Sequence, residues 1–185
     1  LVGVLTFAVL IALGVALATW SVDDPSFNHA LDRAPKNWLG YPGAAVADEL
    51  MQFLGLGVLL FVAIPMTWAV RFFGHHGIAR PLRSLPAWLA CSVTFSASLS
   101  ALPAPSAWSL ASGLGGNAGD VLHNLLLMIL SLGLKGLLAK IVAGGAMVAA
   151  TGYLALRATG WGRKDTVQNA GRIALLTHAA TAAVL

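Results

Sequence analysis

Apolar runs long enough to cross a bilayer alternate with short polar stretches along most of the chain. A membrane-crossing helix needs about 20 mostly apolar residues, because the hydrocarbon core is about 30 Å thick. The first run covers about 1–20 and the second about 44–70, separated by a polar stretch at 21–43 that takes the backbone out of the bilayer. The second run is longer than one crossing requires, so we expect it to be tilted or kinked, with Pro65 as the cause of the kink.

The rest of the pattern predicts two further crossings and one shorter helix. The third crossing, at about 85–102, carries a stripe of serines and is placed inside the helix bundle, because hydroxyls in lipid bond to carbonyls. From 120 to 159 the chain is apolar for about twice the length of one crossing. Glycines and lysines at 133–140 mark the break, which leaves a fourth crossing at about 137–156. The preceding helix, at about 117–132, is too short to cross comfortably and is expected to be interfacial or re-entrant.

Basic residues set the orientation, because cytoplasmic loops of membrane proteins hold the excess of lysine and arginine. The basic topology determinants flank the second, third and fourth crossings: Arg71, Arg80, Arg83, Arg157, Arg163 and Lys164. Four crossings with both termini in the cytoplasm place all of them inside, whereas a fifth crossing would put the last three outside. The predicted fold is therefore an all-α membrane protein with four transmembrane helices, one short interfacial or re-entrant helix, and cytoplasmic termini.

The composition excludes a soluble globular enzyme. Of the 185 residues, 58% are hydrophobic and 10% are charged, with a mean hydropathy of +0.80, whereas soluble domains carry roughly a quarter charged residues. The pI near 9.7 does not indicate a nucleic-acid patch, because the basic residues flank apolar segments. We divide the chain into a transmembrane domain at 1–160 and a cytoplasmic juxtamembrane segment, or start of a linker, at 161–185.

The first apolar run has two interpretations. Residues 16–18 have the small-x-small pattern of a signal-peptidase site, so a cleaved signal peptide is one alternative. The run at 1–18 exceeds the usual length of such a core and lacks a basic leader, which favours a retained first membrane helix.

No residue pattern indicates catalysis, a cofactor site or a metal site. The glycine-rich segment 113–120 lacks the lysine and hydroxyl residue of a phosphate-binding loop. Asn117 and Asp120 resemble a capping box at a helix start. His123 would share a helical face with Asp120, and a local contact is favoured over an acid–base dyad.

Ionisable residues close to the apolar runs need an explanation, because charge is costly in lipid. These residues are Asp48, Glu49, Lys135 and Lys140. One alternative is an ion or proton path. We favour a position at the outer interface, where the lysines extend towards the headgroups and can pair with the two carboxylates.

Several motifs resemble the N-terminal four-helix membrane domain of the FtsK/SpoIIIE family of bacterial DNA translocases. They include Asp23-Asp24-Pro25-Ser26-Phe27, Asn37-Trp38-Leu39-Gly40, Gly43-Ala44 with Ala47-Asp48, Gly55, Pro65, Gly115-Gly116 and Gly119. The resemblance covers about residues 1–160 and is stronger in the first half. The candidate structural or partner residues of the outer face are Asp24, Pro25, Phe27, Asp48, Glu49, Gly115, Gly116, Asp120 and Lys135.

The resemblance implies an inner-membrane anchor at the division septum, with the lipid bilayer, other division proteins and further copies of the chain as partners. Contact with DNA, and any use of ATP and Mg²⁺, would belong to a motor domain that is not in this sequence. The alternative function is a small multi-pass transporter or channel subunit, supported only by the serine stripe. A membrane-embedded enzyme would need a convergent set of ionisable groups, which the sequence lacks.

Overall fold

The structure, a computed structural model, describes residues 1–27, 33–74, 77–78 and 80–160. Its regular elements are α1 (Val2–Ala18), α2 (Gly40–Leu54), the 3-10 turn η1 (Gly55–Gly57), α3 (Val58–Phe73), α4 (Pro81–Leu99), α5 (Gly116–Leu130) and α6 (Leu137–Ala158). No β-strand occurs within the described residues. The predicted juxtamembrane segment 161–185, with Arg163 and Lys164, lies outside them.

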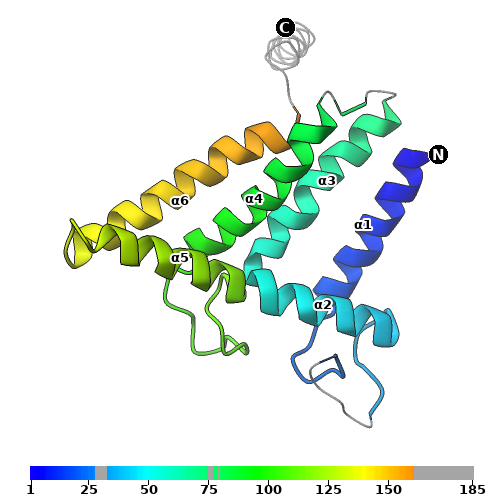
Figure 1. The fold of residues 1–185 in the computed structure, drawn as a ribbon. Helices are drawn as coiled ribbons and strands as arrows, with labels where there is room; N and C mark the ends of the chain where they lie inside the picture. Colours follow the sequence, from blue (N-terminus) through cyan, green and yellow to red (C-terminus); the bar gives the residue numbers. More distant parts are fainter. Residues whose placement is uncertain (28–32, 75–76, 79, 161–185) are drawn as a thin grey trace, which may run out of the picture.

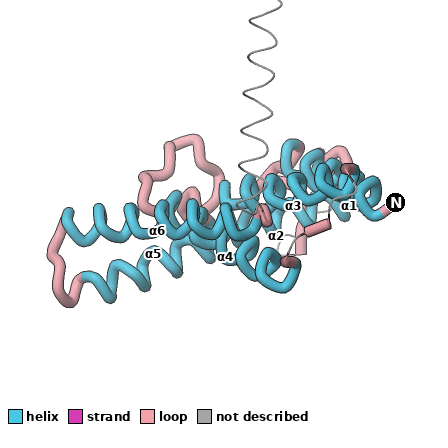
Figure 2. The backbone as a smooth tube through the Cα atoms, turned by 90° about the horizontal axis from the view of Figure 1, so that it is seen from above, coloured by secondary structure: helices cyan, strands magenta, loops and turns pink. Residues whose placement is uncertain are grey.

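The long helices form a row rather than a closed bundle. The order along the row is α1, α3, α4 and α6, and each helix packs on the next (Figure 1). Seen from above, the row is a shallow layer (Figure 2). Helices α2 and α5 lie across one end of this layer, which we call the α2–α5 end. The opposite end, where α3 ends and α4 begins, we call the arginine end.

The predicted helices agree with the observed ones in number and approximate position, apart from the second crossing. Two segments of the described chain are long and apolar enough to cross a membrane, Gly40–Phe73 and Leu137–Ala158, while α1 is apolar but has only 17 residues. The break before α6 lies at Gly136, which has a φ of +57°. The count of four crossings and the cytoplasmic position of both termini remain predictions.

The second apolar run is not one continuous helix with a kink at Pro65. It is broken at Gly55, which has a φ of +54°, and the chain turns there from α2 into α3 (Figure 1). This conformation favours glycine, because a side chain would be strained at positive φ. The apolar pattern alone could not show this, since both helices are apolar.

Pro65 instead lies within α3 and is buried. A proline lacks the N–H that would bond to the carbonyl four residues earlier, here Phe61. The indole N–H of Trp88, on α4, donates to that carbonyl oxygen at 2.9 Å. The missing helix bond is thus replaced by a bond between helices.

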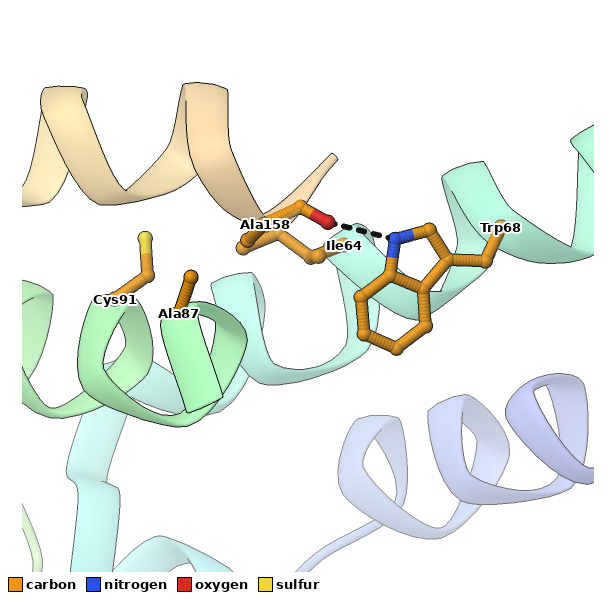
Figure 3. Packing of buried hydrophobic residues seen from close by; sticks show 5 residues of the cluster. All are labelled: Ile64, Trp68, Ala87, Cys91 and Ala158. Atoms are coloured by element: carbon orange, nitrogen blue, oxygen red, sulfur yellow. Dashed lines mark hydrogen bonds between the residues drawn. The ribbon is translucent and has the colours of Figure 1, made fainter. Parts of the chain in front are cut away.

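Trp68 anchors the arginine end of the layer. It is 5% exposed and packs with Ile64, Ala87, Cys91 and Ala158, and its indole N–H donates to the Ala158 carbonyl at 2.8 Å (Figure 3). Tryptophans near the end of a membrane crossing are often interfacial, and Trp68 holds such a position in the sequence. Its burial shows a core role instead, joining α3 to the end of α6.

Charge is unevenly distributed between the two ends, because the described charged side chains at the arginine end are all basic and the opposite end carries both signs. Four arginines lie at the arginine end, in the last turn of α3, at the start of α4 and in the last turn of α6: Arg71, Arg80, Arg83 and Arg157. The other described arginine and lysines lie in the loop before α2, at the turn between α5 and α6, or at the start of α6: Arg33, Lys36, Lys135 and Lys140. The described carboxylates lie in the loop before α2, in α2 or in α5: Asp23, Asp24, Asp48, Glu49 and Asp120. The layer is therefore electrically polarised along its helices.

Candidate functional site: the α2–α5 end

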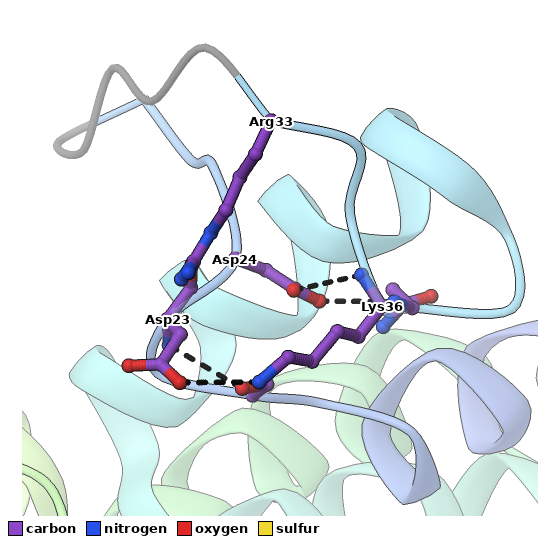
Figure 4. Close-up of polar contacts among 6 residues, drawn as sticks. Asp23, Asp24, Arg33 and Lys36 are labelled. Carbon is purple, nitrogen blue, oxygen red and sulfur yellow. Dashed lines mark hydrogen bonds and ion pairs between the residues drawn. The ribbon is translucent and has the colours of Figure 1, made fainter.

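Asp24 organises the connection between α1 and α2. It is 3% exposed, and its carboxylate accepts hydrogen bonds from the backbone N–H groups of Lys36 at 2.8 Å and Asn37 at 3.0 Å (Figure 4). Two hydrogen bonds to a charged acceptor offset the cost of burying it. The neighbouring Asp23 is exposed and pairs with the Lys36 ammonium at 3.2 Å. Thus Asp24 fixes the fold of this loop.

Asn37 joins the same loop to α1. It is 4% exposed, and its side-chain N–H₂ donates to the Ala16 carbonyl at 2.7 Å, near the end of α1. Its side-chain oxygen accepts from the backbone N–H of Leu39 at 3.1 Å, just before α2 begins. Helix ends leave such groups without partners, so this one amide satisfies both helices. In the sequence, Asn37 stands out only as part of a motif that resembles the FtsK/SpoIIIE family, because nothing local shows that its side chain is buried.

Asp48 is held inside the fold by neutral donors. It is 5% exposed, and its carboxylate accepts from the Trp20 indole at 3.3 Å and from the Gln52 amide at 2.7 Å. The expected pairing of Lys135 or Lys140 with this carboxylate is wrong. Both lysines are exposed, at the turn between α5 and α6 and at the start of α6, away from α2 (Figure 1).

Five glycines form a close junction between α2, α4 and α5: Gly55, Gly57, Gly115, Gly116 and Gly119. A Cβ on Gly116 would lie 2.5 Å from the Gly55 nitrogen, and one on Gly119 would lie 2.6 Å from the Ser96 carbonyl carbon. These distances are shorter than van der Waals contact. The junction therefore requires glycine because backbones approach one another directly.

Ser96 completes the glycine junction. Its hydroxyl is fully buried and lies 2.8 Å from the carbonyl oxygen of Leu54, the last residue of α2. The Leu56 N–H donates to the Leu114 carbonyl at 2.8 Å. The helix break at Gly55 leaves the Leu54 carbonyl and the Leu56 N–H outside regular helix bonding, and both thus have a hydrogen-bond partner. The placement of the serine stripe inside the helix layer is confirmed by the burial of Ser92 and Ser96.

Asp120 has a structural partner that differs from the expected ones. Its carboxylate accepts from the Gly113 N–H at 2.9 Å, so it ties the preceding loop to α5. Asn117 does not cap the helix, because α5 begins at Gly116 and its first residues lack a side-chain cap. His123 is 7% exposed and its Nδ1 has no hydrogen-bond partner in the described chain. The predicted contact between Asp120 and His123 is therefore not formed.

The sequence-predicted residues of the outer face do not form one cluster. Asp24, Pro25 and Phe27 lie in the loop, where the first two are buried, and Asp48 and Glu49 lie on α2. The other candidates lie next to α5, within it or after it: Gly115, Gly116, Asp120 and Lys135. Besides charged residues, the loop exposes two large aromatic side chains: Phe27 is 82% exposed and Trp38 is 80% exposed. Among the described residues, no three His, Cys, Asp or Glu side chains are grouped to hold a metal ion.

Two arginines at the arginine end, Arg157 and Arg71, make hydrogen bonds with nearby residues. Arg157 donates to the Tyr153 hydroxyl at 2.6 Å and lies over its ring. Ser84 donates to the Arg157 carbonyl at 3.3 Å, which joins α4 to α6. Arg71 donates weakly, at 3.5 Å, to the Gly77 carbonyl.

A layer of apolar helices with a basic end and a loop-covered opposite end defines an α-helical membrane domain. Residues 1–162 match the family model of the 4TM region of DNA translocase FtsK/SpoIIIE, and the chain belongs to this family.

Three relatives illustrate the similarity, each a DNA translocase FtsK. The protein of Agrobacterium fabrum is 37% identical over 182 residues, which are 96% of this chain and 20% of that protein. The protein of Rhizobium meliloti is 43% identical over 66% of this chain and 13% of its own length, and that of Bradyrhizobium diazoefficiens is 38% identical over 81% and 18%. The chain thus spans about a fifth or less of these relatives. No solved structure matches it.

Proposed function

We propose that this chain is the membrane-anchoring and division-protein interaction domain of a septal DNA translocase in the bacterial inner membrane. The observation that carries the proposal is the family match over residues 1–162. The four arginines at the end of the layer that has no described carboxylate support an orientation with both termini in the cytoplasm. In this proposal the domain needs no cofactor, and ATP, Mg²⁺ and DNA are bound by a motor domain elsewhere in the protein.

The interaction surface that we propose for other division proteins is formed by the described parts of the connection between α1 and α2, at 19–27 and 33–39. Asp24 and Asn37 hold the loop to both helices. On this fixed support, Phe27 and Trp38 expose most of their surface. Large aromatic side chains on a rigid support are typical anchors of protein interfaces. Self-association of the domain is part of the same proposal.

The alternative of a transporter or channel subunit rested on the serine stripe. In the structure these hydroxyls lie within hydrogen-bond distance of backbone carbonyls: Ser92 of Trp88, Ser96 of Leu54 and Ser92, and Ser100 of Ser96. Because these hydroxyls bond to the backbone, they do not support a polar pathway for a transported solute or ion. The coding sequence after residue 185 separates the two functions: a long linker and a phosphate-binding loop support the translocase, and an early stop supports the transporter.

The test is the position in the cell of the full-length protein fused to a fluorescent protein. We expect a band at mid-cell for the wild type. The double substitution Phe27→Ala/Trp38→Ala should leave the protein in the membrane but spread it along the cell, because anchors of the interface are lost. Leu132→Ala is the matched control, since Leu132 is 88% exposed in a different loop. A wild-type fusion spread evenly over the membrane would contradict the septal role, and one in the cytosol would contradict anchoring.

A further inference from the structure

An apolar groove lies between α1 and α3. Its volume is about 420 Å³. The described residues that line it are all apolar: Gly14, Leu17 and Ala18 of α1, Met51 of α2, Leu56 of η1, and Val58, Leu59, Val62, Ala63 and Met66 of α3. An apolar cavity of about 150 Å³ stays free of water and takes up hydrocarbon. A larger groove of the same chemistry is therefore a site for a hydrocarbon ligand.

The groove exists because α1 and α3 diverge. At the arginine end they are in close contact, since a Cβ on Gly3 would lie 2.9 Å from the Phe72 Cβ and the rings of Phe7 and Phe73 are 5.7 Å apart. Towards the α2–α5 end the two helices separate (Figure 1). A Cβ on Gly14 would meet no atom within 4 Å, which independently shows open space on the α1 side of the groove.

We propose that this groove binds an acyl chain of a membrane lipid. Leu59 is 60% exposed, so the groove opens at the surface of a membrane domain, where hydrocarbon is the solvent. Its two methionines, Met51 and Met66, are unbranched and adapt to a flexible chain. Among the described residues of the lining, no side chain offers a charge or hydrogen bond, so recognition falls on the hydrocarbon and not on a headgroup.

The size of the groove favours an acyl chain over a helix of a second copy. From Val58 to Met66 the groove follows α3 for about 12 Å, at 1.5 Å per residue. A membrane-crossing helix of about 20 residues is about 30 Å long, so it would extend far beyond this stretch. Helix α2 also lies across one end and contributes Met51, so a long helix in the groove would run into it, while a lipid chain can end there.

The test is photo-crosslinking of the full-length protein in liposomes of phosphatidylethanolamine and phosphatidylglycerol. A trace of phosphatidylglycerol carries a diazirine in its acyl chain, and the labelled peptides are mapped by mass spectrometry. We expect labelling of 14–18 and 58–66 to exceed several-fold that of the exposed face of α6. Gly14→Leu, which fills the open space, should abolish the excess. Gly145→Leu is the matched control, because a Cβ there also meets no atom within 4 Å but lies on α6.

A second variant, Ala63→Leu, guards against a folding defect in the first and should give the same loss, because Ala63 is exposed at the groove. Helical content by circular dichroism confirms that each variant is folded. Labelling of α1 and α3 no stronger than that of α6, or unchanged in both filled variants, would overturn the proposal. So would crosslinks from 58–66 to a second copy of the protein in place of lipid.

Discussion

At the scale of single residues, two adjacent aspartates carry different parts of the fold. Asp24 is buried and accepts two backbone hydrogen bonds, whereas Asp23 is exposed and makes an ion pair with Lys36. Replacing a buried acceptor leaves its donors unsatisfied, at a cost of about 1–3 kcal/mol for each group. An exposed ion pair contributes only about 0–1 kcal/mol. The sequence indicated a turn here, but it could not show which carboxylate faces inward, because the two side chains are identical and adjacent in the chain.

We therefore expect Asp24→Ala to lower the free energy of unfolding by about 2–4 kcal/mol, because two buried N–H groups lose their acceptor. Asp23→Ala is the matched control and should lower it by about 1 kcal/mol or less. The measurement is reversible unfolding of the purified protein in mixed detergent micelles, followed by circular dichroism. Equal losses for the two variants would show that the carboxylate of Asp24 does not hold the loop.

At the scale of elements, the ends of helices were partly predictable and the break in the second apolar run was not. The start of α6 follows from Gly133, Lys135 and Gly136 before it, because these residues interrupt an apolar run. The break at Gly55 depends on atoms distant in sequence: the Ser96 hydroxyl on α4 and the Leu114 carbonyl before α5. Pro65 was the more visible signal, but α3 tolerates it because Trp88 supplies the missing donor. Tertiary contacts thus decided where this run breaks.

The pair Pro65 and Trp88 gives a test of this compensation. Trp88→Phe removes the N–H that bonds to the Phe61 carbonyl, so it should lower the free energy of unfolding by about 1–3 kcal/mol beyond the effect of the smaller ring. In a Pro65→Ala background the helix regains its own N–H, and Trp88→Phe should cost less by about 1 kcal/mol. The measurement is a double-mutant cycle in mixed micelles. Additive effects of the two substitutions would contradict the proposed link between them.

At the scale of the whole molecule, the polarised layer makes one orientation more favourable than its inverse. The four described arginines of the arginine end lie where α3 ends, α4 begins and α6 ends. Moving a positive charge outward across a membrane potential costs about 2.3 kcal/mol per 100 mV, so these residues favour the cytoplasmic side. The same geometry places the turn between α5 and α6 near the α2–α5 end (Figure 1). The composition predicted a membrane protein. Only the arrangement of the helices shows that the loop between α1 and α2 and the turn between α5 and α6 lie at the same end of the layer.

The last prediction tests that orientation with single cysteines in a Cys91→Ala background, since Cys91 is the only cysteine of the chain. The sites are Phe27, Leu132 and Leu82, which are 82%, 88% and 89% exposed. A membrane-impermeant thiol reagent applied to spheroplasts should label cysteines at 27 and 132, and should label the cysteine at 82 only after permeabilisation. Because Leu132 lies between α5 and α6, its labelling together with Phe27 would mean that α5 does not cross the bilayer. If Leu132 instead shared the side of Leu82, α5 would be a fifth crossing and the arginines of α4 and α6 would lie on opposite sides.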